Sequence, residues 1–368
     1  MFAIASVCAS DANDMDMVSE DISDTTADNL KISEETVSQS PDGGTFTDLQ
    51  IKINGAGEGG TVNLTNDYKY EDGFSSDGIN IAKSITINGN GFKIDGLGLS
   101  RIFTIDASSK IILNDITFVN GKSTFGSAIN FNNDISECII DNCKFIDNNA
   151  TQNGGALYAK GKFTNSTIKN SEFISSFASK NGGAIYIASS ANDNLFENLT
   201  FSYNAAKGND GGAINFHWEL FNTRFNNVTF FNNRAGKGGG AINTDQDAYY
   251  DNVFVNVNFI NNTALKGGAI HGYGRSYINS FVGCLFANNS VNDNGGAIYY
   301  VRYIQFNIFD NCSFIKNTAN TSNGGALYSQ GIFRDNNITN SEFISNFAAK
   351  MVVQFIAMVM LMIISLKI

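Results

Sequence analysis

The sequence is almost free of proline and poor in charged residues. Of its 368 residues one is Pro, two are His, five are Cys and only 16% are charged. Five Cys are too few for a dense disulfide framework in a chain of this length, and no Cys/His group has the spacing of a zinc site. No segment keeps the apolar period of an amphipathic helix. These absences argue against a helical bundle, a disulfide-stapled scaffold and a zinc-stabilised domain.

Negative charge is concentrated at the start of the chain. The formal net charge is −11, and residues 1–50 hold 11 acidic residues and one Lys, which leaves 24 acidic and 23 basic residues in the remainder. Acidic and basic residues are nearly equal in number after residue 50, so this part of the chain has no basic stripe that would bind nucleic acid. Residues 11–43 are acidic and lack aromatics, which predicts a disordered spacer. Residues 1–10, MFAIASVCAS, are apolar and end in small residues, so we interpret them as the remnant of a secretory signal without its basic start.

What the chain does have is an internal repeat. Asn and Gly favour turns and Phe, Ile, Val and Tyr favour strands, and both groups recur at a fixed spacing. Gly-Gly-Ala-Ile/Leu occurs seven times at steps of 28 or 29 residues, after a degenerate Gly-Ser-Ala-Ile that begins at Gly126. The glycine pairs are Gly154, Gly155, Gly182, Gly183, Gly211, Gly212, Gly239, Gly240, Gly267, Gly268, Gly295, Gly296, Gly324 and Gly325. A second motif, Phe-x-x-Asn, alternates with the first and begins at Phe145, Phe173 (where Ser replaces Asn), Phe201, Phe230, Phe259, Phe286, Phe314 and Phe343.

A unit of this size with two or three short strands cannot close a core alone, so it must stack on its neighbours. We therefore predict an all-β fold, a right-handed parallel β-helix of about 10 coils over residues 44–350, with residues 78–118 as shorter first coils. The Phe column should stack inside, its Asn should form an amide ladder, and the glycine pair should occupy a corner. Cys143, Cys284 and Cys312 share one column, which favours a small interior residue over a disulfide or metal role. We expect no cofactor and no metal.

The alternating GGA[I/L] and FxxN motifs resemble the repeats of chlamydial polymorphic membrane proteins. Because the chain is rich in Asn, the likeness is closer still to the adhesin-like surface proteins of methanogenic archaea. The stretches GTFTDLQ (44–50) and SITINGNGFKIDG (84–96) also resemble the first coils of those proteins. The resemblance implies a secreted, cell-surface β-helix of the pectin lyase-like kind that is associated with adhesion. It supplies no catalytic residue.

Parallel β-helices also serve polysaccharide lyases and hydrolases, so an enzyme is the alternative. Glycoside hydrolysis needs two carboxylates at a fixed separation, and no Asp-Asp pair stands out. The only histidines are His217 and His271, and we interpret the latter as a surface variant. Asp141, Asp193 and Asp210 lie in turn contexts, where Asp bonds to backbone. We expect that the protein is not an enzyme.

The residue after each GGA[I/L] indicates where binding would occur. Because no dry interior accepts Tyr, Asn and His interchangeably, we expect this column to face outward as a ladder that binds glycans or proteins of other cells. The alternative is that like-on-like stacking merely stabilises the sheet. The ladder residues are Asn130, Tyr158, Tyr186, Asn215, Asn243, His271, Tyr299 and Tyr328.

The last residues, MVVQFIAMVMLMIISLKI (351–368), leave the pattern. They are short for a membrane span. Residues 321–350 match 151–180 at 19 of 30 positions, and the repeat then requires Gly-Gly at 352. Restoring one adenine after the Lys350 codon permits Asn-Gly-Gly-Ala-Ile-Tyr. We interpret the tail as a frameshifted repeat rather than a native membrane contact, and the chain as a truncated fragment of a longer protein.

Overall fold

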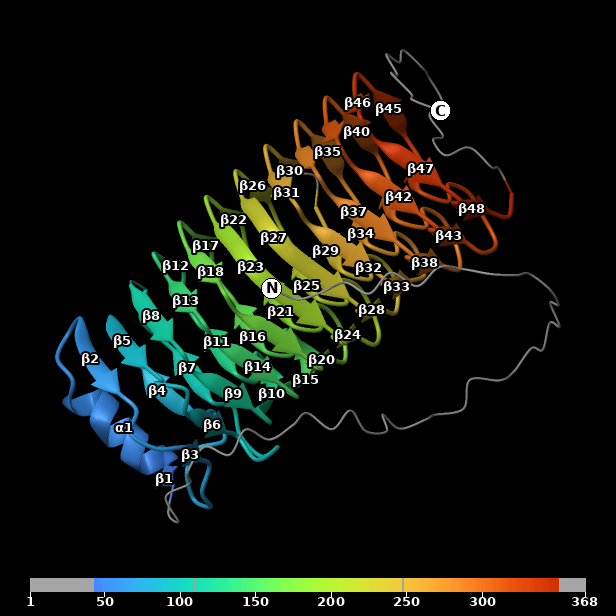
Figure 1. Cartoon of the computed structure of the whole chain (residues 1–368). Helices are drawn as coiled ribbons and strands as arrows, with labels where there is room; N and C mark the ends of the chain where they lie inside the picture. The colour runs from blue at the N-terminus through green and yellow to red at the C-terminus, as the bar shows by residue number, and fades with distance from the viewer. Residues whose placement is uncertain (1–42, 109, 247, 351–368) are drawn as a thin grey trace, which may run out of the picture. The chain divides into compact units, whose positions relative to one another are not determined.

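Each coil of the chain carries short strands that pair in parallel with equivalent strands one coil earlier and one coil later. The computed structural model describes residues 43–108, 110–246 and 248–350. The predicted signal remnant, all but the end of the predicted spacer, and the apolar tail lie outside the described residues. Within them the chain forms a parallel β-solenoid of about eleven coils (Figure 1), which confirms the predicted fold. The additional coil arises because residues 60–69 already pair with the next coil.

Four sheets run along the described part of the solenoid. The coils from β8 to β45 pass through all four in turn, whereas the coils before β8 carry no strand of the nine-stranded or the eight-stranded sheet. The largest sheet has 21 strands: β1 (Gly44–Thr45), β2 (Gly60–Asn63), β3 (Tyr68–Lys69), β5 (Ile85–Asn88), β6 (Lys93–Asp95), β8 (Ile111–Asn114), β9 (Thr117–Val119), β13 (Ile139–Asp141), β14 (Lys144–Ile146), β18 (Thr167–Lys169), β19 (Glu172–Ile174), β23 (Leu195–Ser202), β27 (Arg224–Phe231), β31 (Val253–Val255), β32 (Asn258–Ile260), β36 (Ser280–Val282), β37 (Leu285–Ala287), β41 (Ile308–Asp310), β42 (Ser313–Ile315), β46 (Asn337–Thr339) and β47 (Glu342–Ile344).

The chain then enters a nine-stranded sheet: β10 (Lys122–Phe125), β15 (Asn149–Asn153), β20 (Phe177–Ala178), β24 (Ala205–Ala206), β28 (Arg234–Ala235), β33 (Thr263–Ala264), β38 (Ser290–Val291), β43 (Thr318–Ala319) and β48 (Phe347–Ala348). The ten-stranded sheet follows: β4 (Ile79–Ile81), β7 (Phe103–Ile105), β11 (Ile129–Phe131), β16 (Leu157–Ala159), β21 (Ile185–Ile187), β25 (Ile214–Phe216), β29 (Ile242–Thr244), β34 (Ile270–Gly272), β39 (Ile298–Tyr300) and β44 (Leu327–Ser329). An eight-stranded sheet follows it from the third coil onward: β12 (Ile135–Ser136), β17 (Phe163–Thr164), β22 (Ala191–Asn192), β26 (Leu220–Phe221), β30 (Ala248–Tyr250), β35 (Arg275–Tyr277), β40 (Tyr303–Gln305) and β45 (Ile332–Arg334).

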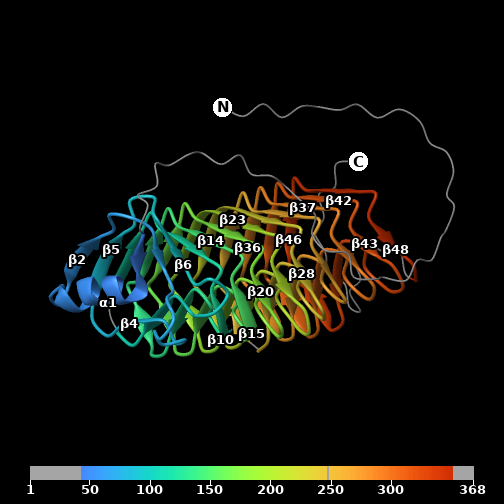
Figure 2. The same cartoon turned by 90° about the horizontal axis from the view of Figure 1, so that it is seen from below.

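One helix precedes the stack, and the sequence pattern did not predict it. Helix α1 (Phe46–Gly55) is capped by Thr45, whose hydroxyl accepts from the Asp48 N–H in a capping box. Its buried side chains Phe46, Leu49 and Ile53 belong to the main core cluster, and Figure 2 shows the helix at the N-terminal end of the stack. Burying these side chains covers core that the first coil would otherwise expose. No helix in the described part of the chain is long and apolar enough to cross a membrane.

The Phe of the Phe-x-x-Asn motifs form one continuous stack inside the 21-stranded sheet. Neighbouring rings lie 4.5–5.0 Å apart between centroids from Phe145 to Phe343. A second stack, which the sequence analysis did not identify, lies five residues earlier in the coils and contains Phe196, Phe225, Phe254, Phe281 and Phe309, with ring centroids 4.6–4.9 Å apart. Both stacks follow from the parallel register, which places each Phe over the equivalent Phe of the next coil.

The Asn of the same motif forms a buried amide ladder. Asn233 Nδ2 donates to Asn262 Oδ1 at 3.0 Å, and that oxygen also accepts from the Asn233 backbone N–H. Asn262 Nδ2 continues the ladder to Asn289 Oδ1 and also donates to the Phe230 carbonyl. Each amide therefore satisfies polar groups that the turn buries. A second ladder runs through Asn252, Asn279 and Asn307 to Asn336.

The glycine pair lies at the corner before the ten-stranded sheet. The first glycine has a positive φ in every copy, for example 65° at Gly154. A Cβ on the second, Gly155, would lie 2.0 Å from the Gly183 carbonyl oxygen of the next coil. The pair thus combines a left-handed backbone with close contact between coils.

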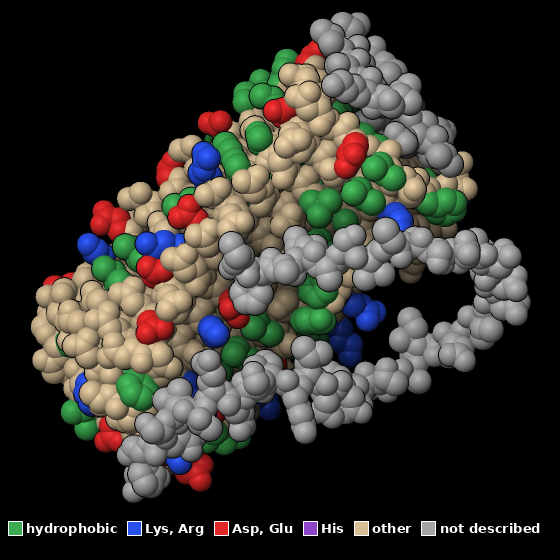
Figure 3. Space-filling model, viewed as in Figure 1, with side chains coloured by type: hydrophobic (Ala, Val, Ile, Leu, Met, Phe, Trp, Pro, Cys, Tyr) green, Lys and Arg blue, Asp and Glu red, His purple; other side chains and the backbone are tan. Residues whose placement is uncertain are grey.

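The cysteines of the described residues are buried thiols. Cys143 Sγ lies 3.3 Å from the Asp141 carbonyl oxygen and 3.5 Å from that of Leu113. Burial raises the pKa of the Cys143 thiol to about 12. Cys138, Cys143, Cys284 and Cys312 form no disulfide in the described part of the chain. On the face that Figure 3 shows, uncharged polar side chains and backbone predominate, with hydrophobic, acidic and basic side chains interspersed.

Candidate functional site

The outer side of the ten-stranded sheet, with the turn residues that follow its strands, is the candidate site, and we name it the lateral face. The residues after GGA[I/L] pair with one another in register from coil to coil. Asn80 and Thr104 extend this column toward the N-terminus. The preceding Ile or Leu in each coil, such as Ile185, belongs to the core cluster, so strand alternation turns the ladder side chains away from the core.

The structure corrects the expected exposure of this ladder. Asn215 and Asn243 are 0% exposed and His271 and Tyr299 are 1% exposed, while Tyr186 is buried as well. Asn130 is also buried, and only Tyr158 and Tyr328 are half-buried. The prediction that the whole column forms an open contact surface is therefore wrong, and so is the interpretation of His271 as a surface variant.

The ladder is covered because the segments before each glycine pair lie over it. A Cβ on Gly238 would lie 2.4 Å from His271 Nδ1, so the backbone of the preceding coil is in contact with that ring. Lys266 Nζ lies 5.7 Å from the centroid of the Tyr299 ring. The Tyr299 hydroxyl bonds Gln330 Oε1 at 2.6 Å. Sequence alternation correctly separates the core side of the sheet from its outer side. It contains no information about the segments that cover the outer side.

A polar cluster lies in the middle of the lateral face, around Asp245. Asn215 Nδ2 donates to Asp245 Oδ2 at 3.0 Å, Asn243 Nδ2 donates to Oδ1 at 2.5 Å, and His217 Nδ1 lies 2.8 Å from Oδ2. His271 Nδ1 contacts Asn243 Oδ1 at 2.5 Å, which requires a proton on that nitrogen because a carbonyl oxygen only accepts. The sequence analysis missed this cluster because its members are about one coil apart in sequence.

Two groups of the cluster have shifted pKa values. Burial, and to a smaller extent the charge of Asp245, raise the pKa of Asp210 to about 6, although Asp210 Oδ1 accepts from the Gly238 N–H at 2.7 Å. Burial and the nearby Lys266 lower the pKa of His271 to about 3. Near neutral pH His271 is therefore neutral. Asp210 is thus a second carboxyl group near Asp245, in a different environment.

Exposed aromatic side chains border the cluster. Trp218 is 51% exposed and its indole lies edge-on to His217, with centroids 6.1 Å apart. Tyr273 is 42% exposed and lies edge-on to His271 at 4.7 Å. His217 itself lies over Tyr186, 6.1 Å between centroids. The accessible aromatic groups of the central lateral face are thus turn residues rather than ladder residues.

A cleft of about 930 Å³ opens at the N-terminal part of the same face. Its lining includes the ladder residues Asn80, Thr104, Asn130 and Tyr158. The further lining residues come from α1, the loops before β4 and β7, the end of β10 and the turns after the ladder strands: Gln50, Gly73, Phe74, Ser75, Asp77, Gly78, Arg101, Asp106, Phe125, Asn132 and Lys160. This volume falls in the range of small-molecule sites.

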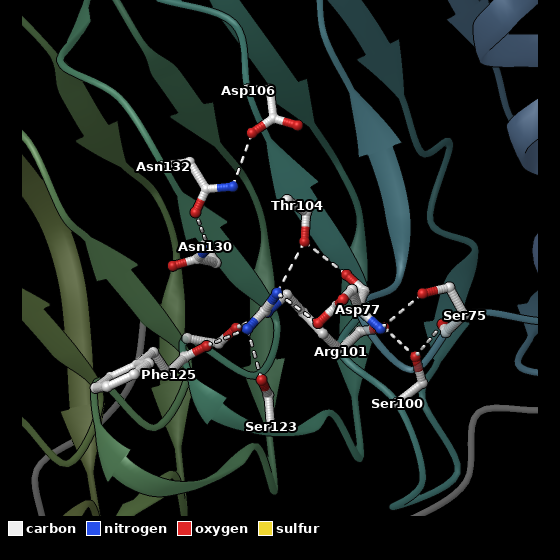
Figure 4. A network of polar contacts seen from close by, with 11 residues as sticks. Ser75, Asp77, Ser100, Arg101, Thr104, Asp106, Ser123, Phe125, Asn130 and Asn132 are labelled. Atoms are coloured by element: carbon white, nitrogen blue, oxygen red, sulfur yellow. Dashed lines mark hydrogen bonds and ion pairs between the residues drawn. The ribbon is translucent and has the colours of Figure 1, made fainter.

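Arg101 holds the walls of the cleft together (Figure 4). Its Nη1 donates to Thr104 Oγ1 at 2.9 Å and lies 3.7 Å from Asp77 Oδ1. Its Nη2 donates to Ser123 Oγ at 2.7 Å and to the Phe125 carbonyl at 3.1 Å, and Nε donates to the Gly126 carbonyl. The guanidinium is buried, and burial lowers its pKa while Asp77 raises it. One cation thus joins three segments of the cleft.

A chain of side-chain hydrogen bonds lies along the cleft beside Arg101. Asn130 Nδ2 donates to Asn132 Oδ1 at 2.6 Å, and Asn132 Nδ2 donates to Asp106 Oδ1 at 2.7 Å. Figure 4 shows these groups beside the Arg101 network. At one end, the rings of Phe125 and Tyr158 lie 4.9 Å apart. Of these residues the sequence analysis singled out Asn130 and Tyr158; the others lie outside the repeat motifs.

Five segments of the chain match the family model of the Chlamydia polymorphic membrane protein (Chlamydia_PMP) repeat. The matches cover residues 142–160, 227–245, 256–273, 283–300 and 311–330, together about a quarter of the chain. Each match runs from the turn inside the 21-stranded sheet to the ladder strand of the same coil or just beyond it. No curated protein and no solved structure is significantly similar to the chain. The repeat resemblance is thereby confirmed, whereas the likeness to archaeal adhesin-like proteins stays a prediction.

Proposed function

We propose that the protein is a secreted, cell-surface, adhesin-like β-solenoid that binds glycans or surface polymers of other cells through its lateral face without catalysing a reaction. The observation that carries the proposal is the match of five coils to the repeat of the Chlamydia polymorphic membrane protein. The lateral face supports it because it combines a cleft with exposed aromatic side chains and hydrogen-bonding groups. Aromatic rings with polar neighbours suit contact with sugar faces and protein surfaces.

The test is binding of the purified full chain to intact cells and to immobilised glycans. Replacing the buried tyrosines of the ladder would disturb packing, so the informative variant is Trp218→Ser combined with Tyr273→Ser, which removes the two exposed rings. We expect at least a fivefold loss of cell binding with an unchanged circular dichroism spectrum. The matched control is Tyr203→Ser, because Tyr203 is similarly exposed but lies outside the lateral face, beside the 21-stranded sheet.

Equal binding by the folded double variant and the Tyr203→Ser control would contradict use of the central lateral face. Failure of the wild-type chain to bind any cell or glycan surface would contradict the proposed function itself. Antibody labelling of intact cells tests the surface location separately.

A carbohydrate-active enzyme is the second candidate, and one observation favours it. Asp210 and Asp245 are two carboxyl groups in different environments, one buried with a raised pKa and one hydrogen-bonded to Asn215, Asn243 and His217. Two neighbouring carboxyl groups in such different environments are the pattern of an acid and base pair. Release of reducing sugar from polysaccharides by the wild type, lost in Asp245→Asn, would favour this candidate over a purely binding role.

A further inference from the structure

The N-terminal cleft differs from the rest of the lateral face because its ladder residues line a cavity. Asn80 is exposed and Tyr158 is half-buried, and both line the cleft. From the middle of the solenoid onward, the equivalent residues Asn215, Asn243 and His271 are buried beneath neighbouring segments. A ligand of a few sugar units in size therefore has access to Asn80 and Tyr158 here, whereas Thr104 and Asn130 between them are buried.

The charge of the cleft indicates which ligand it suits. Two cations, Arg101 and Lys160, and two anions, Asp77 and Asp106, line it, so their formal charges cancel. The donors of Arg101 point to Thr104, Ser123 and two backbone carbonyls, and its charge faces Asp77. Arg101 therefore presents no free fork to a carboxylate or phosphate. This arrangement disfavours an anionic ligand and favours a neutral one.

The remaining lining groups suit a polyhydroxylated ring. Phe74, Phe125 and Tyr158 offer partly exposed aromatic surface, which a sugar can contact with its C–H face. The amides and carboxylates along the cleft, Asn130, Asn132 and Asp106, offer alternating donors and acceptors. Lys160 is exposed, and its ammonium makes no hydrogen bond to another described residue. Apolar surface with a few convergent polar groups is the general form of a small-ligand site.

We infer that the cleft is a saccharide-binding site that takes neutral sugar units of a glycan, with the Phe125 and Tyr158 rings at one end and the Asn130–Asn132–Asp106 chain along its side. This inference rests on the proposed function and deepens it, because it names the place on the lateral face and the ligand class.

The experiment titrates the full chain by calorimetry with neutral tetrasaccharides of β-1,4-linked glucose, N-acetylglucosamine and mannose, and with tetragalacturonate as the acidic counterpart. We expect at least one neutral tetrasaccharide to bind at least tenfold more tightly than tetragalacturonate. Tyr158→Ser should weaken that binding at least tenfold. Lys160→Ala, which removes an exposed side chain without a structural bond, should weaken it about threefold while leaving the fold unaffected.

The matched control is Tyr328→Ser, because Tyr328 is half-buried in the same column but six coils further along. Its affinity should stay within twofold of wild type. The inference is overturned if no neutral tetrasaccharide binds, if tetragalacturonate binds more tightly, or if Tyr328→Ser and Tyr158→Ser lose equal affinity. If Tyr158→Ser still binds cells while the tetrasaccharides fail to bind, the inference about the cleft is overturned and the proposed function still stands.

Discussion

Two columns of side chains run along the solenoid on different sheets, and they differ in how strictly they repeat. The column inside the 21-stranded sheet is Phe in every coil from Phe145 to Phe343. The lateral column changes from Asn to Tyr to His between neighbouring coils, although several of its members are just as buried. Burial alone therefore does not impose one residue type.

The difference lies in what surrounds each column. A Phe ring inside the core can contact only other apolar groups, and stacking at the coil spacing fits one flat ring best. The lateral column is packed among backbone, amides and charged groups, such as Asn215, Asp245 and Lys266. These neighbours can satisfy either an amide or a ring nitrogen, so residue type can vary with local chemistry.

The largest expected effect comes from comparing one substitution in each column. Phe259→Ala should lower the free energy of unfolding by about 3–5 kcal/mol, because it opens a cavity in a continuous ring stack. His271→Asn, which introduces the residue of the preceding coil, should cost less than about 1 kcal/mol at pH 7. Urea denaturation of both variants and the wild type measures the contrast. Similar losses in the two variants would contradict the distinction between the columns.

The next effect concerns the charge of the lateral face. The folded pKa of Asp210 is raised to about 6 from an ordinary 3.8, so between these values the folded protein holds a proton that the unfolded chain has released. Its contribution to stability therefore falls as pH rises from about 4 to about 6 and stays low above. Asp210→Asn should remove this loss and be more stable than wild type by about 3 kcal/mol at pH 7.

Denaturation of wild type and Asp210→Asn at several pH values between 4 and 8 tests this. The lowered pKa of His271 has the opposite effect, because stability is lost as pH falls from about 6.5 toward 3. Since His271 is present in both proteins, it cancels in the difference. A stability difference that does not change with pH would rule out the assigned role of Asp210.

The smallest effect concerns a third column, at the corner between the eight-stranded and 21-stranded sheets. Most coils place Asn or Asp there with a positive φ, as at Asn222, but one coil has Ile278 at φ 55° with 49% exposure. A β-branched residue is strained in this conformation and Asn is less so. Ile278→Asn should therefore raise the free energy of unfolding by about 1 kcal/mol. The reciprocal Asn222→Ile should lower it, and thermal unfolding of both shows whether the corner prefers Asn.

The repeat made most of the fold predictable. The spacing of Gly154–Gly155 and its six later copies, together with the Phe column, predicted parallel coils, an internal ring stack and an amide ladder. Helix α1 was not predictable in the same way, because one short helix outside the repeat has no second copy to reinforce its pattern. The second ring stack carried a usable signal, since Phe196 and its equivalents lie five residues before the motif Phe.

The candidate site was predicted only in part. Alternation correctly placed Tyr158 and its column on the side away from the core, but it could not show that most of this column is covered. Nor could it bring together Asp245 and His217, or Arg101 and Ser123, because these groups are more than twenty residues apart and belong to no motif.

The sequence by itself determined the coil, its length and its interior, because a repeated pattern of Phe, Asn and Gly allows parallel stacking to bury the rings and to pair the amides of the turns in every coil. Only the tertiary structure decided where the lateral face is open. Access depends on how turns of one coil lie against side chains of the next, as Gly238 lies against His271. That contact depends on coil-to-coil geometry, and no local pattern of residues encodes it.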